Sequence, residues 1–520
     1  MTSSAADRRQ FLRLGAAFAG LGAAGPFAMQ LAAMGSAAAQ SAPNYKALVC
    51  IFLLGGNDAN NMVLATDSDS WGRYWSARNT GADPIALMPV GTAAIAPGQT
   101  SSVTGRVATA ATPEAWGGVL PIVPSTPNPV PPGTNATTRT FGLHPFFGPV
   151  QSLFNSGRLA IMANVGTLIQ PTSKAQYVAK SASLPVNLYS HNDQQSEWQA
   201  GAAEGARLGW GGRMADLMMS SNGANSLFTA VSPAGNAVFL SGQNVVQYQI
   251  TTATNPAVMF NSIGGSSLFG STSAPALIKT LLQDSASQAN LMAADYATVD
   301  TRSIGAAGAI NTALTAGAAG SMAAPPIFTN PITGATQTNG LALQMRSIAR
   351  MVAAAPGLGV QRQVFFASLG SFDTHQNENQ SQPVLLAQVA QALSYFDTLL
   401  SNVGGADLRS QVTAFTASEF NRTFTTNGSG TDHAWGSHHL VLGGAVRGKT
   451  IYGQYPTLGI DLGGFNNPNM SGNAIIPTTS VDQYGATLAT WFGVPSSRLA
   501  TIFPNSVNFP ASSLNVGFLG

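Results

Sequence analysis

The chain has 520 residues, of which 45% are hydrophobic and only 8% are charged, with 23 basic and 21 acidic side chains. A near-neutral chain with so few charges lacks the basic surface that nucleic acid requires, so nucleic acid is excluded as a partner. The single cysteine, Cys50, excludes an internal disulfide, and we expect it to be a small buried hydrophobic residue.

The first 39 residues have the organisation of an export signal. Arg8 and Arg9 form a twin-arginine pattern before an apolar stretch rich in Ala and Gly, and three alanines precede Gln40 as a cleavage site. The alternative is an amphipathic N-terminal helix. Removing the signal takes away three arginines and one aspartate and leaves 20 basic and 20 acidic residues. Because no remaining run is apolar enough to span a bilayer, we expect a mature protein in the periplasm or outside the cell, without a transmembrane segment.

Residues 40–520 exceed the usual size of one domain, roughly 100 to 200 residues. No clear linker divides them, and the candidate site residues extend from position 58 to position 439. We therefore expect a single α/β domain with loop-rich insertions near residues 65–140 and 220–335. The first insertion is rich in Pro, Gly and Thr, and the second is rich in Ala, Gly, Ser and Thr with few charges.

Four short apolar runs predict neighbouring strands of one mainly parallel sheet. They cover residues 46–54, 159–165, 363–370 and 412–416. Each run ends at glycine or at polar residues, and unalternating runs of this length are typical of strands that are buried on both faces. Helical spacing at residues 146–157, 341–354, 387–400 and 482–492 completes the pattern of a large sheet flanked by helices.

Polar residues follow the first strand and open a predicted helix. Asp58 follows two glycines at the end of the first strand, as a metal ligand or as an Asx-turn residue. Ser190 stands where a helix begins, as a helix cap or as a nucleophile that benefits from the helix dipole. His191, beside it, would contact a metal or a substrate. His144 precedes a proline at a helix start, and we expect it to have a supporting role.

Two more polar clusters follow the third and fourth strands. Asp373 and His375 close the third strand and point the same way in extended geometry. After the fourth strand come Asp432, His433, His438 and His439, with Glu419 and Arg422 before them. Open α/β sheets keep their chemistry at the carboxyl ends of strands, and carboxylates and imidazoles are ligands of zinc and similar ions.

The adjacent histidines His438 and His439 have different expected directions. Neighbouring residues of an extended segment point to opposite sides, so only one of His438 and His439 is expected to reach a site by side-chain direction. The alternative to a metal site is a set of separately hydrogen-bonded residues around the surface.

These motifs together resemble the DUF1501 family of exported bacterial proteins, whose function is uncharacterised and which often carry twin-arginine signals. The resemblance spans almost the whole mature chain. It rests on Gly-Gly-Asn-Asp at 55–58, Leu-His-Pro at 143–145, Ser-His at 190–191, Gly-Ser-Phe-Asp-Thr-His at 370–375, Ser-Glu-Phe-Asn-Arg-Thr at 418–423 and Thr-Asp-His at 431–433. Ser371 and Asn421 depart from it, because glycine is common at both positions in the family.

The family is in turn similar to the alkaline phosphatase and sulfatase superfamily, which implies an alkaline phosphatase-like sheet and a site that commonly holds two metals. The resemblance implies a first metal site of Asp373 and His375 with His438 or His439, and a second site of Asp58, Asp432 and His433. Asp373 and His375 are two residues apart where the superfamily usually has four, and no superfamily nucleophile motif follows Asp58.

The resemblance implies a metal-dependent hydrolase of phosphate or sulfate esters, with a small-molecule or polymer ester as substrate. Its candidate catalytic residues are Ser190, His191 and Arg422. Two divalent ions about 3.5 to 4 Å apart would clamp the reacting oxygens, Arg422 would hold a further oxygen, and Glu419 would orient a ligand histidine. The candidate ions are zinc, manganese, calcium and magnesium. The competing class is a non-catalytic exported protein, such as part of a surface assembly, that uses the same fold for binding.

Overall fold

The computed structural model describes residues 45–253, 266–284 and 290–520. The expected export signal and its cleavage site lie outside the described residues. Within those residues, none of the helices combines the length and the apolar character that crossing a membrane requires.

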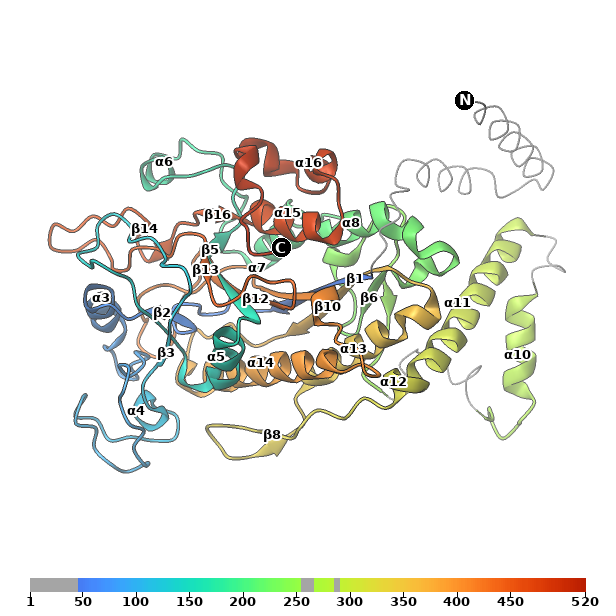
Figure 1. Cartoon of the computed structure of the whole chain (residues 1–520), viewed down its shortest axis with the longest axis horizontal. Helices are drawn as coiled ribbons and strands as arrows, with labels where there is room; N and C mark the ends of the chain where they lie inside the picture. The colour runs from blue at the N-terminus through green and yellow to red at the C-terminus, as the bar shows by residue number, and fades with distance from the viewer. Residues whose placement is uncertain (1–44, 254–265, 285–289) are drawn as a thin grey trace.

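A nine-stranded sheet lies at the centre of the described structure (Figure 1). Its strands lie in the order β13-β5-β12-β11-β1-β10-β6-β7, and β16 also pairs with β5. They are β1 (Lys46–Leu53), β5 (Leu159–Gly166), β6 (Ala230–Ser232), β7 (Tyr248–Gln249), β10 (Arg362–Leu369), β11 (Val412–Ala417), β12 (Ser437–Gly443), β13 (Ile451–Tyr452) and β16 (Thr479–Ser480). β12 is antiparallel to both of its neighbours, and the other pairs are parallel. The four apolar runs join one mainly parallel sheet, as expected, but they are not all neighbours, because β12 lies between β5 and β11.

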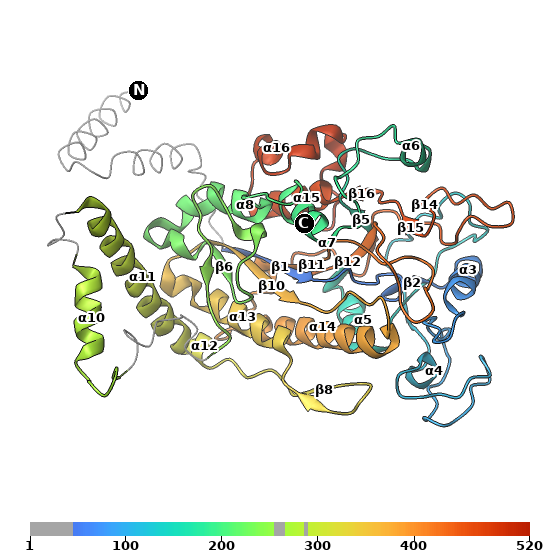
Figure 2. The same cartoon turned by 180° about the vertical axis from the view of Figure 1, so that it is seen from behind.

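Helices cover both faces of the sheet (Figures 1 and 2). On one face lie α5 (Gly148–Asn155), α13 (Gly340–Leu358) and α14 (Glu378–Ser401), and on the other lie α7 (His191–Ala200), α8 (Trp210–Met218), α15 (Val481–Phe492) and α16 (Leu499–Ile502). In β1, Val49 and Ile51 pack against the first group, while Cys50 and Phe52 pack against the second. This is why the apolar run of β1 does not alternate: both faces of the strand are buried.

The two segments expected to be insertions differ from one another. The segment near 65–140 contains α3 (Ser68–Arg78), α4 (Pro113–Trp116) and part of a small sheet of β2 (Val63–Ala65), β4 (Phe141–Leu143) and β3 (Leu120–Ile122). The segment near 220–335 does not lie wholly outside the main sheet, because β6 and β7 extend the edge of that sheet. Its other elements are α10 (Ala274–Gln283), α11 (Leu291–Thr315), α12 (Gly317–Gly320), β8 (Phe328–Thr329) and β9 (Thr336–Gln337).

The remaining elements are short. They are α6 (Lys174–Ala179), β14 (Met470–Ser471), β15 (Ala474–Ile475) and the 3-10 turns η1 (Pro145–Phe147), η2 (Met219–Phe228), η3 (Val238–Leu240), η4 (Arg409–Gln411), η5 (Ser496–Arg498), η6 (Pro504–Asn508) and η7 (Ala511–Ser513). His144 caps η1: its Nδ1 accepts the backbone N–H of Phe146 at 3.2 Å, which agrees with the supporting role expected for it.

Asp58 follows β1, as the sequence indicates, but its buried carboxylate is paired with the buried Arg78 of α3. Arg78 Nη2 donates to Asp58 Oδ1 at 3.0 Å, and Arg78 Nη1 donates to Oδ2. Burial alone would raise the pKa of Asp58, yet the charge and hydrogen bonds of Arg78 hold that pKa below its usual value. Burial and the neighbouring Asp58 raise the pKa of Glu378, the third buried group here, well above its usual value. Asp58 is therefore an ion-pair partner, and the expectation that it is a metal ligand is wrong.

We expect Arg78→Met to lower the free energy of unfolding by about 3–5 kcal/mol at neutral pH, because the variant leaves the charge of Asp58 buried without its cation. Urea unfolding followed by circular dichroism measures this loss. The control is Arg409→Met, which removes ion pairs with the exposed Asp407 and with Asp397, and should cost about 1 kcal/mol because Asp397 keeps Arg158 as a partner. Equal losses in the two variants would contradict the assigned role of Arg78.

Candidate metal-binding site

Loops at one edge of the sheet bring together three histidines and one aspartate. Asp373 and His375 follow β10, His433 precedes β12, and His191 is the first residue of α7. Because β12 is antiparallel to β11, it begins at the edge where β11 ends. The residues thus gather at the carboxyl edge of the parallel strands, where α/β sheets keep their ligand sites.

The carboxylate of Asp373 lies at the centre of this cluster. Its Oδ1 is 3.2 Å from Nε2 of His375 and 3.3 Å from Nε2 of His433, and its Oδ2 is 3.4 Å from Nε2 of His191. The Nε2 atoms of His375 and His433 are 2.9 Å apart. Ligands at 2.0–2.1 Å from a tetrahedral zinc ion lie about 3.3 Å from one another. His191, Asp373 and His433 therefore offer ligand atoms close enough to share one metal ion, and His375 adjoins this group through Asp373 and His433.

Each of the three imidazoles directs its other nitrogen, Nδ1, at an outer acceptor. The pairs are His191 with Glu419 Oε1 at 3.0 Å, His375 with Asp432 Oδ1 at 3.1 Å and His433 with the carbonyl oxygen of Tyr189 at 2.7 Å. Ionised carboxylates and carbonyls accept hydrogen bonds and do not donate them, so each Nδ1 carries the proton. In a neutral ring of this tautomer the lone pair is on Nε2, and the Nε2 atom of each of the three rings lies beside the Asp373 carboxylate. This arrangement is the one that outer hydrogen bonds impose on metal-ligating histidines.

The pKa shifts of His433 and Asp373 favour the forms that bind a cation, whereas the shift of His191 favours the protonated ring. Partial burial lowers the pKa of His433, which favours the neutral imidazole that binds metals. Partial burial would raise the pKa of Asp373, but the hydrogen bond and charge of Arg422 keep it below its usual value. The hydrogen bond to Glu419 raises the pKa of His191 and outweighs the effect of partial burial.

Glu419 is a buried and firmly held support for His191, as the sequence analysis expects. Its Oε1 also accepts the backbone N–H of Gly55 at 2.8 Å and the side-chain amide of Gln195 at 2.9 Å. Gln195 lies one helical turn after His191 on α7. The same helix therefore carries the imidazole and the side-chain amide that holds Glu419, the partner of that imidazole. Sequence reasoning missed Gln195, although its spacing from His191 places both on one helix face.

The two glycines after β1 make room for the site. Gly55 has φ +117°, and a Cβ there would lie 2.4 Å from the backbone nitrogen of Asp373. Gly56 has φ +79°, and a Cβ there would lie 2.3 Å from the ring of Phe420. That ring packs 4.5 Å from the ring of His433 and 4.9 Å from that of His191, between centroids. Sequence reasoning also missed Phe420, which forms an apolar wall behind two of the imidazoles.

Arg422 supports the site through contacts within the protein. Its guanidinium is buried and donates to Asp373 Oδ1 at 2.7 Å, to Thr431 Oγ1 at 3.3 Å, to the Thr431 carbonyl at 2.5 Å and to the Gly55 carbonyl at 3.4 Å. All three nitrogens are engaged within the protein. The prediction that Arg422 holds a substrate oxygen stays a prediction, and the contact that the structure shows is the one that fixes Asp373.

Ser190 occupies the N-cap position of α7, but its side chain makes no cap hydrogen bond. It hydrogen-bonds the carboxylate of Asp193 instead. Both ring nitrogens of the neighbouring His191 lie beside carboxylates, with Nδ1 3.0 Å from Glu419 Oε1 and Nε2 3.4 Å from Asp373 Oδ2. The structure supports a local structural role for this serine rather than the role of a nucleophile.

His438 and His439 point to opposite faces of β12, as the period of a strand requires, and neither reaches the cluster. His438 accepts the backbone N–H of Asn164 at 3.0 Å and stacks on Tyr455, while His439 packs against Trp198 and Tyr484. Complete burial lowers the pKa of each to about 3. The expectation that one of them is a metal ligand is wrong, because β12 carries both into the hydrophobic layers on either side of the sheet.

Asp432 lies outside the group of side chains around Asp373. Its Oδ1 contacts Nδ1 of His375 at 3.1 Å and accepts a hydrogen bond from the side-chain amide of Asn427 at 3.2 Å. The second metal site implied by the resemblance, which needed Asp58 with Asp432 and His433, is not formed by these side chains. Of the described residues, His191, Asp373 and His433 each offer a ligand atom within 4.8 Å of the other two. His375 adjoins this group through the contacts given above.

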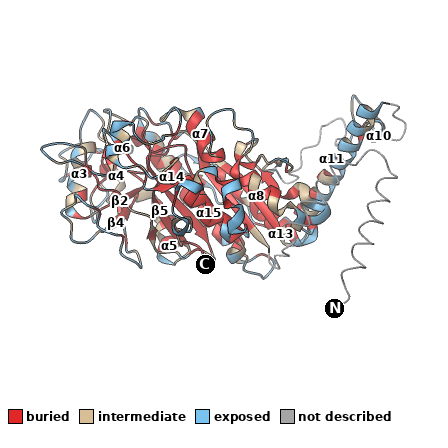
Figure 3. Ribbon diagram, turned by 90° about the horizontal axis from the view of Figure 1, so that it is seen from above, coloured by how far each residue is buried: buried red, intermediate tan, exposed pale blue. Residues whose placement is uncertain are grey.

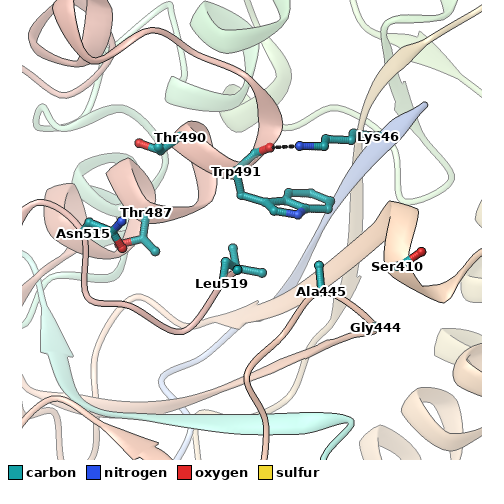
Figure 4. A pocket seen from close by; sticks show the side chains of 10 residues that line it. Lys46, Ser410, Gly444, Ala445, Thr487, Thr490, Trp491, Asn515 and Leu519 are labelled. Atoms are coloured by element: carbon teal, nitrogen blue, oxygen red, sulfur yellow. Dashed lines mark hydrogen bonds between the residues drawn. The ribbon is translucent and has the colours of Figure 1, made fainter. Parts of the chain in front are cut away.

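A pocket of about 520 Å³ lies at the opposite edge of the sheet, where β1 begins (Figure 4). Lys46, Thr487, Trp491, Asn515 and Leu519 are among the residues that line it. The ammonium group of Lys46 donates to the carbonyl of Trp491 at 2.6 Å, and no imidazole or acidic side chain lines this pocket. Its chemistry does not match that of the metal-binding group.

We expect ¹⁵N NMR spectra to divide the imidazoles into two tautomer classes. His191, His375 and His433 should be protonated at Nδ1. His144 and His438 should be protonated at Nε2, because their Nδ1 atoms accept backbone N–H groups. The chain has only six histidines, so single His→Gln variants assign the signals. A spectrum with Nε2 protonated in both His375 and His433 would refute the convergence of lone pairs.

Comparison with known proteins places the chain in a family without supplying a characterised relative. The model of the DUF1501 family, described as a protein of unknown function, matches residues 45–503. No curated protein and no solved structure matches the chain. Because the family match covers most of the sequence, the protein belongs to the DUF1501 family.

Proposed function

We propose that the protein is an exported hydrolase that uses one divalent metal ion, held by His191, Asp373, His375 and His433. The observation that carries the proposal is the convergence of three Nε2 lone pairs on one carboxylate, with each ring fixed by an acceptor at Nδ1. Without a cation these lone pairs would face one another and an anion at 2.9 to 3.4 Å. Groups so arranged favour binding of a metal ion, and that binding would stabilise the fold.

The local charges support a divalent ion. The cluster and its outer partners contain the carboxylates of Asp373, Glu419 and Asp432, and Arg422 is the cation in direct contact with them. With neutral imidazoles these groups sum to two negative charges. A divalent ion would bring the site to neutrality and would offset the cost of burying Glu419.

The side chains leave access from solvent, because those of Asp373 and His375 are each more than 40% exposed. A metal ion held here would lower the pKa of a bound water and polarise an ester oxygen. The role of the protein side chains would be to hold the ion. Three imidazoles and Asp373 would bind it, and Arg422 keeps Asp373 in place. The choice of phosphate or sulfate esters rests on the motif resemblance to the alkaline phosphatase and sulfatase superfamily. Since Arg422 is occupied, the metal would be the cation that receives the ester oxygens.

The decisive experiment compares metal content and hydrolysis in matched variants. We expect His433→Gln to lose bound metal and part of the thermal stability, because it removes a ligand. Glu419→Gln should weaken metal binding about 10- to 100-fold, because it loosens His191. The control is Asp407→Asn, which changes an exposed carboxylate elsewhere and should retain full metal content. Elemental analysis, calorimetric titration with zinc or manganese, and melting curves provide the measurements.

Activity separates the hydrolase from the competing class. The metal-loaded native protein should cleave aryl phosphate or aryl sulfate esters, and His433→Gln should not. Metal binding with no cleavage of any ester would favour a non-catalytic binding protein in which the metal only stabilises the fold. Equal metal content in the native protein and in His433→Gln would remove the basis of the proposal altogether.

We also propose that export follows the twin-arginine pathway, on the basis of the sequence pattern at Arg8 and Arg9. Lysine at both positions should leave the precursor in the cytoplasm, as cell fractionation and immunoblotting would show. A single Arg409→Lys change provides the control for the effect of such a substitution on folding. Unchanged export of the variant with both lysines would exclude this route.

A further inference from the structure

Helices α10 and α11 form a pair that extends from one end of the molecule (Figures 1 and 3). They contact one another, and α11 also contacts α12 and α13. The buried residues of α11 are Ala297, Ile304, Ala307, Ile310 and Leu314, most of them in its second half. The first half of α11 and nearly all of α10 therefore lie away from the core of the protein.

This helical pair carries an exposed apolar surface. Its members are Leu277, Leu281, Leu291, Met292, Tyr296 and Val299, together with Phe269 in the turn before α10, and they are 49% to 101% exposed. Elsewhere in the described structure, the exposed large hydrophobic side chains are valines, apart from Ile327 and Leu462. The seven side chains present on the order of 800 Å² together, if a large apolar side chain exposes roughly 150 Å². The largest apolar patch on a monomer usually covers roughly 300 to 600 Å².

The charges around this surface match one another. Lys279 and Arg302 are basic, and Asp284, Asp295 and Asp300 are acidic. Because both signs occur on this surface, two copies related by a two-fold axis can place acidic side chains opposite basic ones. A negatively charged lipid surface would meet Asp295 and Asp300, so it is a poorer match than a second copy.

We propose that the α10–α11 pair is the contact surface for a second copy of this chain, with the two pairs packed as a four-helix bundle about a two-fold axis. In such a contact each surface meets its own equivalent, so a self-complementary patch is what the symmetry requires. Antiparallel helices with short connections are the usual parts of such bundles. The apolar area is close to the roughly 800 Å² per partner that a standard specific interface buries.

Size-exclusion chromatography with light scattering tests the proposal on the full mature chain. The native protein should have twice the mass of one chain. Leu281→Glu combined with Tyr296→Glu should have the mass of one chain, with an unchanged circular dichroism spectrum, because both side chains are exposed and are not needed for folding. Leu462→Glu, an equally exposed leucine elsewhere, should leave the dimer intact. A native monomer at every concentration, or a dimer that survives the double substitution, would overturn the proposal.

Sedimentation with lipid vesicles tests whether the exposed apolar surface of α10 and α11 binds a lipid bilayer instead of a second copy of the chain. Neutral phosphatidylcholine vesicles and vesicles with added phosphatidylglycerol are mixed with the native protein and with the double variant. The proposal expects the native dimer to remain in the supernatant with both. Binding of a monomeric native chain that the double variant loses would assign the surface to lipid and would overturn the proposal of a second copy.

Discussion

The candidate site depends on the buried guanidinium of Arg422. Its hydrogen bonds reach Asp373 after β10, Thr431 before β12 and Gly55 after β1, so one side chain joins three loops. A planar group with five donors is suited to such a junction, whereas a lysine ammonium would satisfy fewer of these acceptors. Because Arg422 fixes Asp373, and Asp373 is the point on which the three imidazoles converge, the geometry of the whole group follows from this contact.

A second buried charge system lies beside the first. The hydroxyl of Thr431 donates to Glu378 at 2.8 Å and accepts from Arg422 at 3.3 Å, while Glu378 adjoins the pair of Arg78 and Asp58. The chain is only 8% charged, yet several of its charged residues are enclosed here. Buried charges are tolerated when each has a partner, and removal of one leaves the other uncompensated. The loops of the site are thus tied to α3 and α14 by electrostatic contacts rather than by apolar packing alone.

The ligand group that the structure brings together differs from the one that the superfamily resemblance implies. His191, at the start of α7, supplies the third imidazole, and the histidines of β12 belong to the hydrophobic layers. Asp58 is neutralised by Arg78, so the side chains that would complete a second site are engaged elsewhere. Of the described residues, His191, Asp373 and His433 are the ones whose ligand atoms lie within 4.8 Å of one another.

The sequence by itself determined four strands, expected at residues 46–54, 159–165, 363–370 and 412–416 and observed within one residue of these bounds. Unalternating apolar runs that end at glycines or polar residues specify strands buried on both faces. It also determined that His438 and His439 face opposite ways, because the side-chain period of a strand is two. Only the tertiary structure decided which polar groups meet. His191 and Glu419 form a contact although they are 228 residues apart in the sequence. Asp58 pairs with Arg78, which lies on a helix whose position the local sequence does not specify. Local periodicity fixes the direction of a side chain within its own element, so the strands and the polar edge of the sheet were predictable. The partner of that side chain depends on how distant elements pack, so the group of side chains around Asp373 was not predictable.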